Sequence, residues 1–389
     1  MKWGYLMMVK RLTRAVGLLI LLGSLAFQCA ASAQDWIWTT SQIDIEGTDS
    51  SVAVDHQGNV HVAYRFLTHG QLKYAFLPAG KSRWFTMTLD QMLDFFLTGI
   101  TVDPKGNPYI CYSPGVIKVA AFDGQRWNVQ RLDPGSPLIS YYCSIKTGAD
   151  GAPQLSWYVE AGFTLRYATL QNGAWVARTI DTEELPGKFN SLAIDHSGKP
   201  QVSYISLSGT RLKYARFDGQ EWIRTTVEGP NRAIATSRGD TGMGNSIAID
   251  PDGNPMISYF DTSSLKSARM INNKWKFEVI DHFPATPQWG WRMFRTTTVF
   301  DKKGYPHIGY QCPLGLKHAW WDGHEWKTSV ILAPAGPTFD GGMAMDDDDN
   351  IYFSYTDPAQ KTLRLAIGRR SGDQQTAEAQ GSPETNKQP

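Results

Sequence analysis

The sequence predicts an all-β fold, a seven-bladed β-propeller with four antiparallel strands in each blade, and three observations support it. Residues 191–228 contain four short apolar runs separated by turn residues, and each run has the length and the β-branched or aromatic content of a strand. The same unit recurs every 45 to 55 residues, a period typical of propellers. Seven units supply strands one to three, whereas only six supply strand four.

The first landmark of each unit is an Asp-x-x-Gly turn. Five copies are complete, at residues 55–58, 103–106, 195–198, 250–253 and 301–304, while residues 148–151 lack the Asp and residues 346–349 lack the Gly. We expect the Asp carboxylate to accept hydrogen bonds from the backbone N–H groups that follow it, and the Gly to take the left-handed conformation that closes a tight hairpin. Asp349 can replace Gly because Asp visits that conformation more readily than most residues.

When the units are aligned, three more positions after each turn hold the same kind of residue in most units, and each such position is called a column. An aromatic residue stands six positions after the turn, a Lys or Arg follows a Leu or Ile in the third strand, and a Trp opens the fourth strand. An acidic residue comes six positions after five of the six Trp residues. We interpret the aromatic columns as packing between blades, and we expect the basic column to pair with the acidic residues or to lie along a blade face. Sugar stacking and a ring of cationic binding residues are the alternative interpretations.

The fourth strand of the seventh unit is missing from the end of the repeat. The last unit ends after Ala366, whereas Trp38 and Asp44, before the first full unit, have the Trp-to-acid spacing of a fourth strand. We therefore expect residues 38–44 to complete the seventh blade and close the ring, which removes the open sheet edge of a linear array.

The chain is expected to comprise three parts. Residues 1–33 have the basic start, the apolar stretch and the Ala-Ser-Ala ending of a signal peptide, so cleavage after Ala33 and a secreted or periplasmic location follow. A retained anchor and lipidation at Cys29 are the alternatives. Residues 34–368 form the propeller. Residues 369–389 are expected to be disordered because they contain no apolar residue larger than Ala.

Composition limits the partners. The chain has 38 basic and 37 acidic residues, which gives no argument for nucleic acid or an anionic membrane. No transmembrane segment is expected in the mature chain, and we expect a monomer. Cys111 and Cys143 fall on neighbouring blades, so a disulfide and free buried thiols are both open. We expect no cofactor. Residues 346–350 resemble a calcium loop but fall on an ordinary repeat turn, and a structural calcium stays open.

Candidate ligand-binding residues lie where the repeat is interrupted, because loops on a rigid scaffold carry function. Two long loops precede blades five and six, and shorter ones precede blades two and three. The loop of residues 230–245 carries Arg238, the loop of residues 282–295 carries Trp289, Trp291 and Arg292, and the shorter loops carry Phe96 and Tyr142. Aromatic rings with guanidinium groups suit sugars that bear carboxylates or sulfates. His69 lies between strands two and three of blade one.

The repeat SxAxDxxGxPxxxY…LKYA…GxxW resembles secreted bacterial propellers of the sialidase-like, BNR-repeat kind. Ser191 and Asp195 do not have the spacing of the sialidase Asp-box, and an early Arg-Ile-Pro motif is absent, so a six-bladed sialidase is disfavoured. The resemblance implies that some seven-bladed relatives are polysaccharide lyases or glycosidases acting on uronic-acid polymers, with His and Tyr as acid and base. His69 and Tyr142 are the candidates for those roles here, although no motif aligns them.

Two functions remain from the sequence. The first is an exported, non-catalytic carbohydrate-binding or protein-binding module that uses the loop face carrying residues 230–245 and 282–295. The second is a polysaccharide lyase or glycosidase acting on a uronic-acid-containing glycan at the same face. The regular repeat favours the first. A pocket that gathers His69, Tyr142, Arg238 and Arg292 would favour the second.

Overall fold

The computed structural model describes residues 35–91, 97–132, 140–206, 208, 211–229, 243–261, 263–284, 295–333, 341–357 and 359–371. The chain divides into two units, Trp38–Arg369 and a smaller one of residues 1–37 and 370–389. In the smaller unit, the guanidinium of Arg370 lies 5.2 Å from the ring centre of Trp36. The predicted signal peptide and residues 372–389 of the predicted tail lie outside the described residues.

The larger unit is built from seven four-stranded antiparallel sheets, as the sequence predicts. Blade 1 contains β2 (Thr48–Val54), β3 (Val60–Phe66), β4 (Gln71–Leu77) and β5 (Phe85–Gln91), and blade 2 contains β6 (Gly99–Val102), β7 (Pro108–Tyr112), β8 (Lys118–Phe122) and β9 (Trp127–Arg131). Blade 3 contains β10 (Ser140–Thr147), β11 (Pro153–Val159), β12 (Thr164–Gln171) and β13 (Ala174–Asp181), and blade 4 contains β14 (Pro186–Ile194), β15 (Pro200–Ser206), β16 (Arg211–Phe217) and β17 (Trp222–Glu228). Blade 5 contains β18 (Met243–Ile249), β19 (Pro255–Phe260), β20 (Ser264–Ile271) and β21 (Lys274–His282), and blade 6 contains β22 (Thr296–Phe300), β23 (Pro306–Cys312), β24 (Gly315–Trp321) and β25 (Trp326–Leu332). Blade 7 contains β26 (Met343–Met345), β27 (Ile351–Asp357), β28 (Thr362–Arg370) and β1 (Trp36–Asp44).

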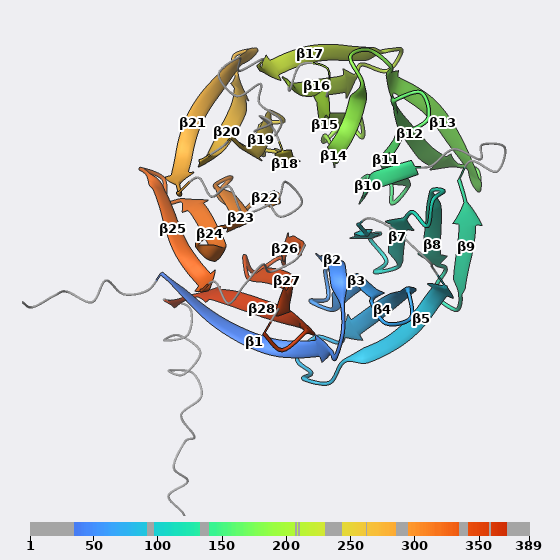
Figure 1. Ribbon diagram of the computed structural model, residues 1–389, viewed down its shortest axis with the longest axis vertical. Helices are drawn as coiled ribbons and strands as arrows, with labels where there is room; N and C mark the ends of the chain where they lie inside the picture. Colours follow the sequence, from blue (N-terminus) through green and yellow to red (C-terminus); the bar gives the residue numbers. More distant parts are fainter. Residues whose placement is uncertain are drawn as a thin grey trace, which may run out of the picture. The chain divides into compact units, whose positions relative to one another are not determined.

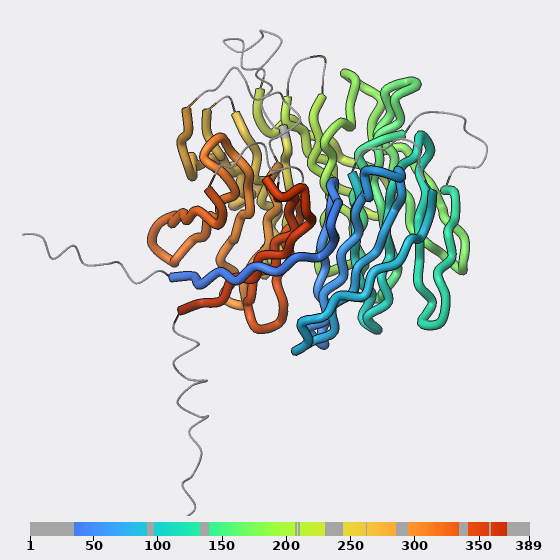
Figure 2. The backbone as a smooth tube through the Cα atoms, turned by 60° about the horizontal axis from the view of Figure 1, so that its bottom comes forward, coloured from blue at the N-terminus to red at the C-terminus, as the bar shows by residue number. Residues whose placement is uncertain are grey.

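The blades are arranged in a ring (Figure 1), and residues of the inner strands line a channel at its centre. The first strand of each full blade is nearest the centre, and the fourth is at the periphery. Figure 2 shows the strands running between the two faces of the ring. The sheet of blade 7 has the order β1-β28-β27-β26, so that strands from the two ends of the chain lie side by side in it.

The two long loops are shorter than the sequence suggested. Met243 already begins β18, so the first loop ends at residue 242 rather than 245. β21 continues to His282 before the second loop begins. Tyr142 and Cys143 also belong to a strand, β10, instead of the segment that precedes it. The inner strands β10 and β18 therefore begin earlier, and the outer strand β21 ends later, than the sequence predicts.

The repeat turns have the predicted geometry. The Asp55 carboxylate accepts hydrogen bonds from the backbone N–H groups of Gln57, at 2.9 Å, and Asn59, at 2.8 Å. Gly58 has φ of 79°, and Asp349 takes the same left-handed conformation with φ of 59°. The turn at Asp346 is filled in the same way, because that carboxylate accepts hydrogen bonds from the backbone N–H groups of residues 348 and 350.

The Trp column packs between blades, as interpreted from the sequence. Trp127 of blade 2 contacts Tyr74 of blade 1 edge-on, with ring centroids 4.9 Å apart. The same contact joins Trp222 to Tyr167 at 5.4 Å, and Trp275 to Tyr214 at 5.3 Å. These rings cover clusters of buried Leu, Ile and Val side chains between neighbouring sheets. The described residues include no helix with the length and apolar character needed to cross a membrane.

Candidate binding site in the central channel

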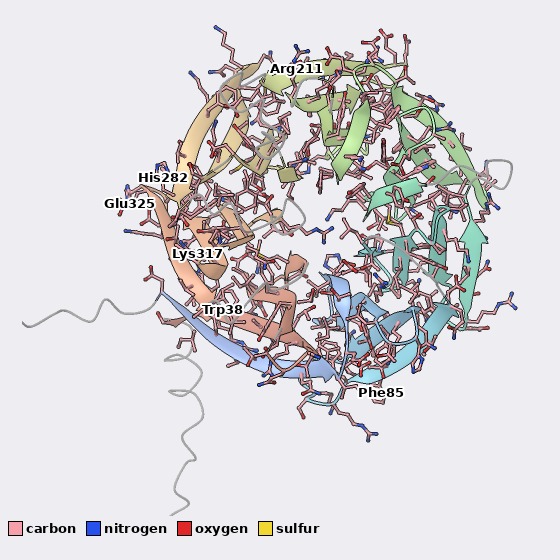
Figure 3. All side chains as sticks on the ribbon, in the orientation of Figure 1. Trp38, Phe85, Arg211, His282, Lys317 and Glu325 are labelled. Carbon is pink, nitrogen blue, oxygen red and sulfur yellow. A yellow bond between two sulfur atoms is a disulfide. The ribbon has the colours of Figure 1, made fainter. Side chains whose placement is uncertain are left out.

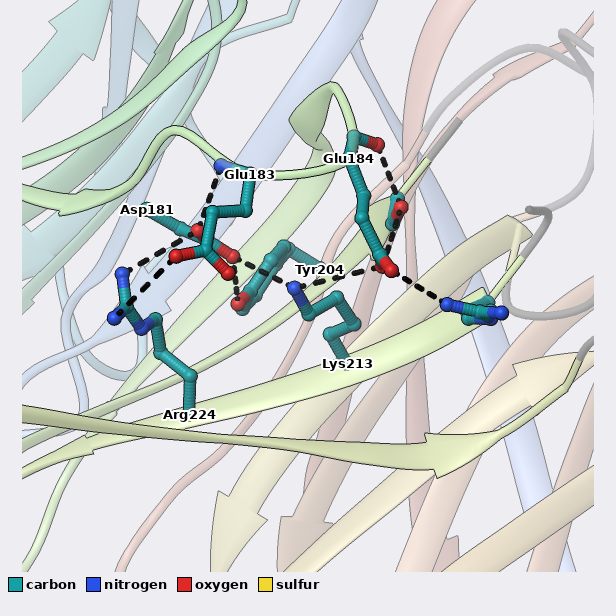
Figure 4. Close-up of polar contacts among 8 residues, drawn as sticks. Asp181, Glu183, Glu184, Tyr204, Lys213 and Arg224 are labelled. Carbon is teal, nitrogen blue, oxygen red and sulfur yellow. Dashed lines mark hydrogen bonds and ion pairs between the residues drawn. The ribbon is translucent and has the colours of Figure 1, made fainter. Parts of the chain in front are cut away.

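Neighbouring blades are joined by a buried carboxylate network, shown for blades 3 and 4 in Figure 4. Asp181, at the end of β13, accepts hydrogen bonds from Tyr204 Oη at 2.7 Å and Lys213 Nζ at 2.9 Å, both in blade 4. The backbone N–H of Glu183 donates a third, and Arg224 lies 3.5 Å away. The predicted pairing of the basic column with the acidic residues is confirmed here.

Among the residues that the structure describes, the same network recurs at four other junctions. It links Asp44 to Tyr64 and Lys73, Asp90 to Tyr112 and Lys118, Glu228 to Tyr259 and Lys266, and Asp281 to Tyr310 and Lys317. Burial opposes ionisation of Asp181, yet the hydrogen bonds from Tyr204, Glu183 and Lys213 outweigh it and hold its pKa below the ordinary value. Burial and the neighbouring carboxylate raise the pKa of Tyr204. These tyrosines and lysines therefore hold the ring together.

A second series of contacts joins the inner strands closer to the channel. In each blade the residue eight positions before the last residue of the Asp-x-x-Gly turn takes part. This residue contacts the preceding blade. Ser156 donates a hydrogen bond to Asn190 at 2.6 Å, Ser258 to Thr296 at 2.8 Å, Ser50 to Ser354 at 2.9 Å, Ser203 to Asn245, and Thr98 to the carbonyl of Ala63 at 3.2 Å. The corresponding residues between blades 6 and 7 are both glycine, Gly309 and Gly341, and a Cβ on either would collide with blade 7.

A disulfide occupies this position between blades 2 and 3. Cys111 in β7 and Cys143 in β10 are bonded, and their Cα atoms are 6.2 Å apart. Of the two possibilities left open by the sequence, the structure has the disulfide. Its two cysteines take the places that Ser156 and Asn190 take at the next junction, so it is a covalent form of the same contact. Cys312 is buried and unbonded.

Each of blades 1 to 5 has a residue with left-handed backbone conformation near the start of its inner strand. It stands nine positions before the end of the turn, and its φ is 51° at Asp49, 66° at Leu97, 52° at Tyr142, 51° at Phe189 and 58° at Gly244. In blade 3 the pairing register shifts between Tyr141 and Ser144, which is a β-bulge. Side chains as large as Tyr and Phe rarely adopt positive φ, and bulges redirect side chains beside binding sites.

The neighbouring blade stabilises this conformation. The Nδ2 group of Asn190 donates hydrogen bonds to the carbonyls of Tyr142 and Gly187. Asn245 donates in the same way to the carbonyl of Phe189 at 2.6 Å. The rings of Tyr142 and Phe189 contact each other, with centroids 4.8 Å apart. The two aromatic residues thus form a pair, the Tyr142–Phe189 pair, held by side chains of the next blades.

A cavity of about 160 Å³ lies in the channel against the Tyr142–Phe189 pair. Its walls come from the inner strands of all seven blades and are rich in Ser, Thr and Asn side chains. Lys146 and Arg295 also line it, whereas no Asp or Glu is among the lining residues that the structure describes. The cavity therefore combines an aromatic wall, hydroxyl and amide groups, and positive charge.

The predicted site residues fall into two groups. Tyr142 lines the channel cavity and is partly buried. His69 is exposed in the turn between β3 and β4, where its ring stacks on Phe66 with centroids 5.9 Å apart, and it does not line the cavity. The candidates that lie outside the described residues are Phe96, Arg238, Trp289, Trp291 and Arg292. His69 and Tyr142 therefore do not share this cavity.

A second cavity, of about 390 Å³, opens between blades 1 and 2 at the periphery of the ring. Tyr74, Phe76, Phe122 and Trp127 line it together with Phe85, which lies on the outer strand β5 and is 56% exposed (Figure 3). These aromatic side chains, with Met87 and Pro108, make its walls more apolar than those of the polar, positively charged channel cavity. Among the described residues, no group of three or more His, Cys, Asp or Glu side chains could hold a metal ion.

Solved structures share the fold. An ulvan lyase of a new polysaccharide lyase family, bound to -[GlcA(1-4)Rha3S]-, aligns with a TM-score of 0.57 and 14% identity over 87% of this chain and 99% of that one. A protein of unknown function from Dyadobacter fermentans aligns with a TM-score of 0.52 and 11% identity, over 87% and 100%. YCF48 bound to a D1 peptide aligns with a TM-score of 0.51 and 14% identity, over 92% and 98%. At these identities the similarity concerns the fold alone. No family model and no curated protein matches the chain.

Proposed function

We propose that the protein is a binding module whose ligand, a glycan, contacts the mouth of the central channel. The observation that carries this proposal is the Tyr142–Phe189 pair, in which two large aromatic residues keep left-handed backbone conformations and line a cavity. Strain of this kind costs of order 1–3 kcal/mol per residue and persists where the surroundings enforce it, which makes it a pointer to function. Gly244 is the strain-free residue at the same repeat position.

The lining of the cavity supports a sugar ligand. An aromatic face offers an apolar platform for the C–H groups of a sugar ring, and Ser, Thr and Asn side chains around it exchange hydrogen bonds with hydroxyl groups. The alternative is a polysaccharide lyase or glycosidase. That reaction needs an acid and a base at one site, and His69 lies away from the cavity that Tyr142 lines. The binding function therefore has the better support.

Export is part of the proposal. The basic and apolar features of residues 1–33 predict it, and the disulfide between Cys111 and Cys143 supports it because such bonds persist in oxidising compartments. A secreted or periplasmic location would expose the channel mouth to extracellular glycans.

The test is a panel of neutral and acidic oligosaccharides titrated against the full chain. Tyr142→Asn and Phe189→Asn should weaken binding about tenfold or more, because each removes an aromatic contact. Asn is chosen because it tolerates positive φ. Phe85→Ala, an aromatic deletion on the outer strand β5, is the matched control and should bind normally.

Two results would overturn the proposal. Binding that is indifferent to both Asn variants would remove the channel mouth from consideration. New unsaturated ends or reducing ends in the oligosaccharides would establish catalysis and replace the binding function with the lyase or glycosidase. If no glycan binds, a peptide library on the same variants becomes the test of a protein ligand.

A further inference from the structure

Lys146 interrupts the repeat inside the channel. It stands on β10, five positions before the end of its turn. The residues at the same position in the other blades are Ala53, Thr101, Ala193, Ala248, Val299 and Ala344. Six blades therefore build this position with small or uncharged side chains, and blade 3 alone places a long cation there. A position that the fold fills with Ala has no structural need for lysine.

The ammonium group of Lys146 has no partner of opposite charge among the described residues. The side chain is exposed to water in the channel, and the protein atoms that line the channel lower the pKa of Lys146 by partial desolvation, with no opposing carboxylate. The other lysines of the inner network contrast with it, since Lys213 pairs with Asp181 at 2.9 Å. A cation that faces the channel without a carboxylate partner is available to pair with a bound anion.

The walls of the cavity suit an anion. Besides Lys146, the titratable lining residues are Arg295 and Tyr142, and Cys143 is bonded in the disulfide. Hydroxyl-bearing residues such as Ser144 and Ser191 line the cavity as well. Lysine, arginine and hydroxyl groups are the donors that bind carboxylate and sulfate oxygens in charge-assisted hydrogen bonds. A volume of about 160 Å³ has room for such a group and a few water molecules.

We propose that the channel cavity is an anion site in which Lys146 binds a carboxylate or sulfate group. This inference rests on the proposed function of the channel as a ligand site, and it adds that the ligand carries an acidic group that enters past the Tyr142–Phe189 pair. Lys146 then selects acidic ligands over neutral ones of the same shape.

The test uses sodium sulfate and sodium acetate, titrated against the full chain by calorimetry at constant ionic strength. Lys146→Ala recreates the residue present in four other blades, so the variant should fold. Lys274→Ala is the matched control, because Lys274 is exposed on the outer strand β21. We expect saturable binding of at least one anion to the wild type and to Lys274→Ala, and a loss of about tenfold or more in Lys146→Ala.

A second measurement reports on the site directly. Reductive ¹³C-methylation of the lysines gives Lys146 an NMR signal, identified by its absence from Lys146→Ala, and this signal should shift on addition of the anion. Equal binding in wild type and Lys146→Ala, or a signal that sulfate and acetate leave unmoved, would overturn the inference and indicate a solvated lysine. The two proposals fail separately. Glycan binding that depends on Tyr142 without a Lys146-dependent anion effect refutes the anion site alone, and the reverse result refutes glycan binding alone.

Discussion

Replacement of Asp181 by Asn should weaken the contact between blades 3 and 4 and lower the free energy of unfolding. Asn keeps the shape of the side chain but removes the charge that Lys213 pairs with, and Lys213 is only 6% exposed. Breaking a buried ion pair by removing one partner costs about 3–5 kcal/mol. Glu184 reduces the cost, because its Oε2 lies 3.8 Å from Lys213 Nζ and remains in the variant. We therefore expect a loss of about 3 kcal/mol in the free energy of unfolding.

The measurement is urea unfolding followed by tryptophan fluorescence, since Trp222 packs between the same two blades. The midpoint should fall while the slope of the transition stays constant. Glu325→Gln is the control, because Glu325 is largely exposed and its pair with Lys327 should contribute less than about 1 kcal/mol. A loss below about 1 kcal/mol in Asp181→Asn would refute the reasoning, because it would mean that solvent replaces the carboxylate at little cost.

Three other predictions concern the ring. Replacing Cys111 and Cys143 by Ala should lower the free energy of unfolding by about 3–4 kcal/mol by the loop-entropy relation, since 32 positions separate them in sequence. Replacing them by Ser and Asn, the pair found at the next junction, should recover about 1 kcal/mol of this loss in the same urea assay. Gly309→Ala should lower the melting temperature, because its Cβ would stand 2.2 Å from Phe353 Cε2, and overpacking costs about 1–3 kcal/mol; an unchanged melting temperature would contradict the contact. Hydrogen bonds hold the pKa values of Asp90 and Asp181 below the ordinary value, so the stability that these two carboxylates contribute should be fully present above about pH 4 and be lost as the pH drops through their folded-state pKa values. In Asp181→Asn this acid-dependent loss should be smaller.

The repeat made the fold predictable. The Asp-x-x-Gly turns, with their fixed spacing, depend on interactions within a few residues, such as the hydrogen bonds of the Asp55 carboxylate. The acidic, tyrosine and lysine columns were visible as well, because each uses one residue type in most blades. The structure added which blade supplies which partner.

The inner contacts were not predictable for a physical reason. Ser, Thr, Asn, Cys and Gly all occur at the position of Asn190, because any small residue fits there and the bonding partner lies in another blade. Their common feature is small size, which is a weak signal in a single sequence. The sequence predicts Tyr142 as a candidate in a loop, whereas it lies in β10, because a bulge with positive φ in a strand leaves no simple pattern. Lys146 is not among the residues predicted from the sequence, and its signal is the contrast with Ala, Thr or Val at the same position of the other six blades.

The junction between blades 6 and 7 differs from the others in a way that affects how the ring opens. Gly309 and Gly341 provide no side-chain bond there, and Leu332 stands where other blades have an acidic residue. By contrast, the disulfide crosses the junction between blades 2 and 3. We expect local opening of the ring to occur first between β23 of blade 6 and β27 of blade 7. The remaining blades should stay folded during this opening. Amide protons of β26 and β27 would then exchange with solvent before those of β7 and β10, and a folding chain could close into a ring by forming the contact between blades 6 and 7 last.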